Sequence, residues 1–141
     1  MRWTIYNSYK VTSTEIKTLE QEYLKRLTGK ATIRLEEGQK ANDSSLLKKL
    51  KPSSFLVLLD ETGELCSSTE FSKSLEKWQA SSKEVVFAIG GPSGWRAEAK
   101  ERANKTLSLS KLTFPNQLVR LILLEQLYRA CCITSGHPYH K

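Results

Sequence analysis

Residues 85–89 read VVFAI and run directly into GGPSG at residues 90–94. Five consecutive apolar residues are typical of a strand buried on both faces, as in a parallel sheet covered by helices on each side. Residues 55–59, which read FLVLL, form a second run of this kind. The two runs predict an α/β fold with a mostly parallel sheet and helices on both faces.

The segments around these two runs alternate between strand and helix patterns. We expect strands at residues 3–6, 31–36 and 107–109, and helices beginning at 14, 42, 68, 96 and 118. Thr14 is the expected cap of the first helix, which Gly29 ends, and Ser68 is the expected cap of the helix that carries Phe71, Leu75 and Trp78. The helix over residues 118–133 is apolar on nearly every side and so needs cover on every side. A dimer interface would supply the missing cover, and a core position is the alternative.

Length and composition limit the class of protein. The 141 residues, 39% hydrophobic and 26% charged, suit one domain over residues 1–141 with a real core. No apolar run reaches the roughly 18 residues of a spanning helix, so we expect no membrane partner. Three cysteines, two of them adjacent, make a poor disulfide or zinc framework. We therefore expect a cytoplasmic protein with reduced cysteines and no metal.

Positive charge is concentrated at the two ends of the chain. The formal net charge is +7, and residues 1–54 hold 11 basic against 6 acidic side chains. Residues 91–141 hold 8 basic against 3 acidic side chains, whereas residues 55–90 hold 3 against 6. An excess of this kind favours a polyanionic partner, and a solvated basic surface without function is the alternative.

Three loops are expected at the carboxyl edge of the sheet, where α/β proteins bind their ligands. They are residues 60–63, 90–94 and 110–115. The glycine loop at 90–94 fits neither G-x-G-x-x-G nor G-x-x-x-x-G-K-[ST], so a dinucleotide or P-loop site has little support. A tight turn remains an alternative for this loop. A hydrolase triad of Ser93, His137 and Asp60 is disfavoured because the G-x-S-x-G elbow is absent.

Residues 85–141 resemble the ribosomal large-subunit methyltransferase H family. The resemblance rests on the glycine loop, LSLSKLTFP at 107–115, LVR at 118–120 and HPYH at 137–140. Residues 58–60 with Gly63, followed by SSTEF at 67–71, extend it toward the first half of the chain.

The resemblance implies a SPOUT-class α/β enzyme with a C-terminal trefoil knot that works as a homodimer. The family transfers a methyl group from S-adenosylmethionine to N3 of a pseudouridine in 23S rRNA, on the assembled ribosome. Carried over by position, the cofactor pocket consists of Leu59, Asp60, Gly90, Gly91, Ser110, Lys111, Leu112, Thr113, Phe114 and Pro115. Such a pocket offers backbone groups and apolar walls, which explains why the glycine loop matches no phosphate fingerprint.

The same resemblance suggests residues for the reaction. Arg120 and Arg129 are candidates for a cation beside the uracil carbonyls or for phosphate contacts, with an ion pair to Glu125 as the alternative. His137, Tyr139 and His140 are candidates to close over the target base or to accept its proton. A tail ordered only for dimer packing is the alternative for these three residues.

The first half of the chain departs from the family pattern. Its first strand begins with Trp3, Glu64 follows Gly63 where the family commonly has lysine, and the basic loop at 38–40 is reduced to GQK. These departures concern rRNA docking more than methyl transfer. Two other functions therefore stay open: a SPOUT methyltransferase for another RNA such as tRNA, and a ribosome-binding module without catalysis.

Overall fold

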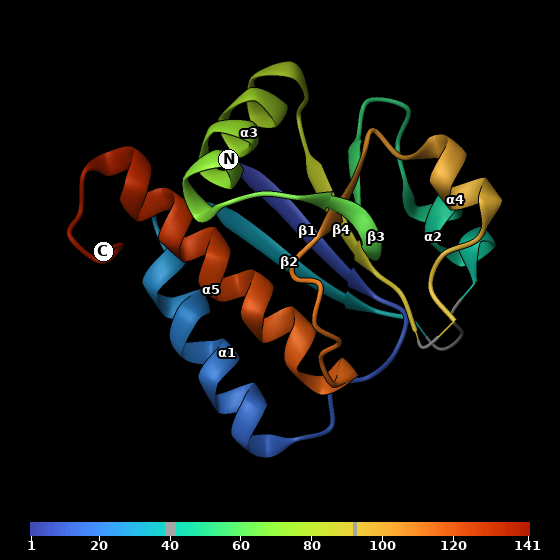
Figure 1. Ribbon diagram of the computed structural model, residues 1–141, viewed down its shortest axis with the longest axis horizontal. Coiled ribbons are helices and arrows are strands. Elements are labelled where there is room, and N and C mark those ends of the chain that lie inside the picture. Colours follow the sequence, from blue (N-terminus) through green and yellow to red (C-terminus); the bar gives the residue numbers. More distant parts are fainter. Residues whose placement is uncertain (39–41, 92) are drawn as a thin grey trace.

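The structure is a computed structural model that describes residues 1–38, 42–91 and 93–141. Within these ranges, parallel strands form one five-stranded sheet in the order β2-β1-β4-β3-β5 (Figure 1). The two apolar runs form neighbouring strands near the middle of the sheet, so the prediction of a parallel sheet is confirmed. The strands are β1 (Arg2–Asn7), β2 (Thr32–Glu37), β3 (Phe55–Leu65), β4 (Val85–Ile89) and β5 (Lys105–Ser108).

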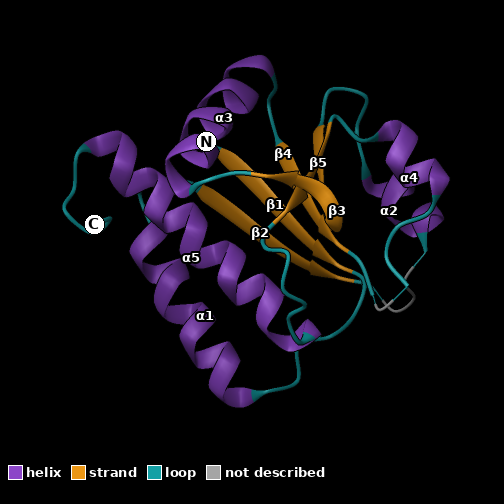
Figure 2. Ribbon diagram, in the orientation of Figure 1, coloured by secondary structure: helices purple, strands orange, loops and turns teal. Residues whose placement is uncertain are grey.

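Helices cover both faces of the sheet, as predicted (Figure 2). One face packs against three helices, α1 (Thr14–Leu27), α3 (Ser68–Ser81) and α5 (Asn116–Ser135). The other face packs against two shorter helices, α2 (Asp43–Lys49) and α4 (Ala97–Arg102).

Each face of the sheet has its own core. Alternate residues of β4 divide between them, with Phe87 in the core under α1, α3 and α5 and Ala88 in the core under α2 and α4. All five residues of β4 are buried, because both faces of this strand are covered.

The N-caps of two helices differ by one residue from those expected. Ser13, not Thr14, accepts the hydrogen bond from Ile16 N at the start of α1. Ser67, not Ser68, caps α3 and forms a capping box with Glu70. The predicted end of α1 is confirmed, since Gly29 follows the C-cap Thr28 with a φ of +83°, the conformation in which glycine commonly ends a helix.

Strand β3 is longer than the sequence indicates. Residues 60–63, expected as a loop, continue the strand, and its pairing with β5 shifts register between Leu59 and Glu64. Gly63 lies against β5 so closely that a Cβ there would come within 2.7 Å of the Thr106 backbone. β5 begins two residues before the expected strand, and α5 extends two residues beyond the expected helix at each end.

Two sequence predictions include residues outside the described ranges. The glycine loop at 90–94 contains Pro92, and the reduced loop at 38–40 contains Gln39 and Lys40. None of the helices in the described part of the chain is both long enough and apolar enough to cross a membrane.

Candidate cofactor pocket and C-terminal cluster

A pocket of about 390 Å³ opens at the carboxyl edge of the sheet. Parallel strands bring their carboxyl ends to one edge, so the ends of β3 and β4 and the loop after β5 meet there. Most of the predicted cofactor residues line the pocket: Leu59, Asp60, Gly90, Gly91, Ser110, Leu112 and Phe114. Lys111, Thr113 and Pro115 belong to the same loop, but they are not among the lining residues.

Asp60 places an ionised carboxylate in this pocket. Its Oδ1 accepts hydrogen bonds from Thr62 N at 2.9 Å and from Thr62 Oγ1 at 2.7 Å. Burial favours the neutral acid, but these hydrogen bonds and the charge of Lys100 outweigh it and lower the pKa of Asp60. Its Oδ2 lies 3.9 Å from Lys100 Nζ and faces Gly94. This oxygen can therefore accept a hydrogen bond from a ligand.

The glycine loop is held to the sheet by the tryptophan that follows it. Trp95 is buried, and its Nε1 donates to the carbonyl oxygen of Ala88 at 3.1 Å. A Cβ at Gly90 would lie only 3.2 Å from that Nε1, and Gly94 has a φ of +69°. The loop therefore needs glycine at both positions to pass between Trp95 and the pocket.

The loop after β5 forms the apolar side of the pocket. Ser108 Oγ donates to the carbonyl oxygen of Ser110, and Leu112 N donates to Ser110 Oγ at 3.0 Å. Leu112 is 72% exposed, so its side chain reaches out over the mouth of the pocket. Phe114 lines the pocket floor beside the first turn of α5.

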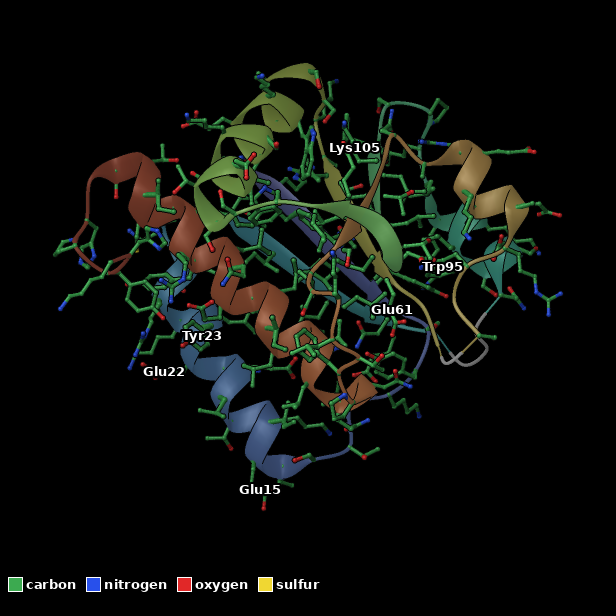
Figure 3. All side chains as sticks on the ribbon, in the orientation of Figure 1. Glu15, Glu22, Tyr23, Glu61, Trp95 and Lys105 are labelled. Atoms are coloured by element: carbon green, nitrogen blue, oxygen red, sulfur yellow. The ribbon has the colours of Figure 1, made fainter. Side chains whose placement is uncertain are left out.

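Sequence reasoning did not assign several residues that line this pocket, among them Trp95, Lys100, Leu109 and Val119. Trp95 directly follows the glycine loop in the sequence, and this position could have indicated that it lines the pocket. Lys100 lies on α4 and reaches the pocket only through the packing of α4 on the sheet, which no local pattern indicates. Figure 3 shows Trp95 and Glu61 on the side of the molecule where β3 and α4 meet.

Arg120 lies apart from the pocket, contrary to expectation. Its side chain is 4% exposed and binds Glu20 through two hydrogen bonds of 2.6 and 2.9 Å. A third bond, of 3.2 Å, joins its Nη1 to Glu37. Burial disfavours the charge, but these carboxylates outweigh it and raise the pKa of Arg120. Arg120 therefore joins α5 to α1 and β2, and the expected alternative partner, Glu125, is not its partner.

Arg129 and the C-terminal tail form a separate cluster, which we call the tail cluster: Tyr23, Glu125, Arg129, Tyr139 and His140. Arg129 binds Glu125 Oε1 at 2.6 Å, and its guanidinium lies 4.9 Å from the centre of the Tyr139 ring. Tyr139 donates to the same carboxylate at 3.1 Å and meets the hydroxyl of Tyr23 on α1. Figure 3 labels Tyr23 on α1.

The protonation states of the tail residues follow from their contacts. Burial, together with hydrogen bonds to Tyr23 and Glu125, raises the pKa of Tyr139 well above its usual value. His140 Nδ1 lies 3.0 Å from Arg129 Nη1 and must accept there, because a guanidinium only donates. His137 Nδ1 likewise accepts from Tyr139 N at 3.2 Å. In the neutral form both rings thus carry their proton on Nε2.

The pocket lies at the start of α5, whereas the tail cluster lies along the middle and second half of this helix. The pocket is lined by Asn116 and Val119, whereas the tail contacts Glu125 and Arg129. Ten residues of helix between Val119 and Arg129 correspond to about 15 Å. Figure 1 shows the C-terminus beside the end of α5 that is farther from the loop after β5. Within one chain, the tail therefore does not reach the pocket.

Nearly the whole sequence matches a known family. A family model described as "Predicted SPOUT methyltransferase" matches residues 1–140. The chain belongs to the SPOUT methyltransferase family. It is accordingly a methyltransferase.

Relatives in this family carry one common name, Ribosomal RNA large subunit methyltransferase H. The protein of that name from Trichlorobacter lovleyi is 48% identical over 107 residues, 75% of this chain and 70% of the relative. That from Francisella philomiragia is 39% identical over 140 residues, 96% of this chain and 88% of the relative. That from Bacteroides thetaiotaomicron is 36% identical over 138 residues, with 97% and 88% covered.

The residues that the structure describes contain no group of three or more His, Cys, Asp or Glu side chains arranged to hold a metal ion.

Proposed function

We propose that this methyltransferase uses S-adenosylmethionine to methylate N3 of a pseudouridine in 23S rRNA on the assembled ribosome. The observation that carries the proposal is the pocket at the carboxyl edge, which gathers the ends of β3 and β4 and the loop after β5. The names of the relatives support an rRNA substrate, and the net charge of +7 suits a nucleic acid.

The chemistry of the pocket residues fits S-adenosylmethionine. Leu109, Leu112, Phe114 and Val119 offer an apolar wall for an adenine ring. At the other side, Asp60 Oδ2 offers a carboxylate oxygen to an ammonium or ribose hydroxyl. We assign the remaining loop residues, Lys111, Thr113 and Pro115, to shaping this wall. The sequence of the glycine loop matches no phosphate-binding fingerprint, and S-adenosylmethionine carries no phosphate.

Bound S-adenosylmethionine supplies a methyl group on a positively charged sulfur. In the reaction the N3–C bond forms as the C–S bond breaks, and N3 gives up its proton. The residues of this chain contribute by holding the acceptor nitrogen in line with the methyl group and by keeping water out. We assign Arg129 to the uracil carbonyls, where its positive charge favours the deprotonated imide.

The tail residues are the proposed contacts to the target base. Tyr139 keeps its proton because its pKa is raised, so we assign it to donation or packing. His137 and His140 are the proposed proton acceptors, and each must first release the contact that Nδ1 makes in this structure. Arg120 is a positioning residue, since it fixes the first turns of α5 beside the pocket.

We propose a homodimer, because none of the tail residues lines the pocket of its own chain, which lies at the start of α5. A second copy packed along α5 would bring its tail to this pocket and cover apolar side chains that are only half-buried here: Leu118, Leu121 and Ile122. We also propose that residues 1–141 form one SPOUT domain with a C-terminal trefoil knot and work in the cytoplasm, without a membrane partner.

Two substrates distinguish this function from its alternatives. Labelled S-adenosylmethionine is incubated with the chain and either large ribosomal subunits lacking the modification or unmodified tRNA. We expect label in 23S rRNA alone. Label in tRNA alone would show that the substrate is tRNA and not rRNA. If calorimetry detects no S-adenosylmethionine binding, the chain is a binding module and the proposal is wrong.

A further inference from the structure

A second hollow lies at the amino edge of the sheet, the end opposite to the cofactor pocket. It has a volume of about 290 Å³ and lies between the starts of β1 and β2 and the helix α2. It adjoins a further hollow of about 500 Å³, with which it shares Arg2, Thr32 and Glu84. We call the two together the amino-edge groove. The C-terminal part of α2, a helix of seven residues, forms one side of the groove.

Basic side chains dominate the amino-edge groove. Five cations line it, against two carboxylates, Glu36 and Glu84; the cations are Arg2, Arg34, Lys49, Lys51 and Lys83. The net formal charge of the groove is therefore positive, in contrast to residues 55–90 of the chain, in which acidic side chains outnumber basic ones.

The two carboxylates are already engaged by the protein. Glu36 lies 3.1 Å from Lys49 and 3.7 Å from Arg34. Glu84 accepts from Thr4 Oγ1 at 2.8 Å and from Ser54 Oγ at 3.3 Å. Among the described residues, no carboxylate lies within ion-pair distance of Arg2, Lys51 or Lys83. These three cations are available to an external anion.

The aromatic residues near the groove are not available to nucleobases. Trp3 lines it but is fully buried, and Tyr6 is 1% exposed beneath Lys49. A single-stranded nucleic acid bound through its bases needs exposed aromatic faces. The groove therefore suits phosphate groups, which lysine and arginine neutralise without reading sequence.

We propose that the amino-edge groove binds the phosphodiester backbone of the substrate RNA, at a site separate from the methyl-transfer pocket. The inference rests on the proposed function for the identity of the RNA. Strand β1 has six residues, so the groove and the pocket are about 20 Å apart along the sheet. An RNA that contacts both must span about 20 Å, so the groove would hold the backbone at a distance from the methylated base.

The test is the double variant Arg2→Gln/Lys51→Gln, because both side chains are exposed and neither has an ion-pair partner in the described residues. The matched control is Lys73→Gln/Lys77→Gln, which removes the same charge from the exposed side of α3. Affinity for large ribosomal subunits is measured over a range of salt concentrations, and methyl transfer is followed in parallel. Thermal unfolding verifies that each variant is folded, and Arg34→Gln/Lys83→Gln serves as a second groove variant.

We expect the groove variants to bind ribosomal subunits on the order of tenfold more weakly, with KM raised and kcat unchanged. The slope of the logarithm of affinity against the logarithm of salt concentration should fall by about one for each cation removed. Groove variants that bind like the wild type, or a control that weakens binding equally, would overturn the proposal. A wild-type chain that binds subunits but transfers no methyl group would refute the proposed function, while the binding comparison would still decide the role of the groove.

Discussion

Arg120 lies where α5, α1 and β2 meet, and its guanidinium is bound there by Glu20 and Glu37. Removing one member of a buried ion pair leaves an unpaired charge in a poorly solvated place, which typically costs about 3–5 kcal/mol. The contact lies next to the pocket along the chain, because Asn116 and Val119 of the same helix line it.

We therefore predict that Arg120→Gln lowers the free energy of unfolding by about 3–5 kcal/mol, measured by urea denaturation. Arg129→Gln is the control, because the Arg129 side chain is 25% exposed and its pair with Glu125 is better solvated. The control should lose less than half as much free energy of unfolding as Arg120→Gln. Equal losses in the two variants would show that burial of Arg120 carries no extra stabilisation.

Asp60 gives the pocket a pH dependence. Because its pKa lies below the ordinary 3.8, the ionised form stabilises the folded chain above that pH. The stabilisation is lost as the pH falls through the folded-state pKa. Asp60→Asn keeps an oxygen that can accept from Thr62 N but removes the charge.

We predict that Asp60→Asn is less stable than the wild type at neutral pH and that this difference shrinks as the pH falls below about 4. Urea denaturation at several pH values measures this difference in stability. Thr62→Val, which removes one of the two donors to Asp60 Oδ1, should give an intermediate profile. A stability difference that stays constant from neutral pH to pH 2 would contradict this explanation.

At the scale of elements, the hydrogen bonds at helix starts show which residue is the cap. At the start of α1 the side chain of Ser13 accepts from Ile16 N, whereas that of Thr14 contacts only Glu15 at the surface. We predict that Ser13→Ala destabilises the chain by about 1 kcal/mol and that Thr14→Ala changes stability by less than about 0.5 kcal/mol. Thermal unfolding of both variants measures the difference. A larger loss of stability in Thr14→Ala than in Ser13→Ala would show that Thr14 is the cap, as expected from the sequence.

Strands and helices could be predicted from the sequence wherever their pattern is local. The runs at 55–59 and 85–89 are continuous and apolar, so both strands and their parallel arrangement follow directly. The extension of β3 beyond Leu59 could not be predicted. It depends on Gly63 passing close to the backbone of Thr106, some forty residues further along the chain.

The candidate site was predictable to the extent that it lies on strand ends. The carboxyl-edge rule brings Asp60, Gly90 and Ser110 together, and all three line the pocket. Lys100 and the partners of Arg120 were missed because they come from other elements, with Glu20 a hundred residues away from Arg120. Only tertiary packing reveals such contacts.

At the scale of the whole molecule, the proposal requires a second copy. Leu121 is half-buried on α5, where a partner would cover it. We predict that light scattering at micromolar concentration gives twice the 16.0 kDa mass of one chain. Leu121→Glu should give the single-chain mass. Leu19→Glu, at an apolar residue of α1 that is 50% exposed, should leave the mass unchanged. A wild-type monomer would contradict the homodimer and the proposed role of the tail.

We propose that the chain binds S-adenosylmethionine in the pocket at the carboxyl edge and methylates N3 of a pseudouridine in 23S rRNA. The most direct test is mass spectrometric mapping of 23S rRNA from large subunits treated with S-adenosylmethionine and the chain. Gly90→Leu is the matched negative control, because a side chain there would collide with Trp95 Nε1 and the Gly94 backbone and so displace residues that line the pocket. We predict one added methyl group, on N3 of a pseudouridine, with the wild type and none with Gly90→Leu. A methyl group on another base or position, or no methylation by the wild type, would contradict the claim.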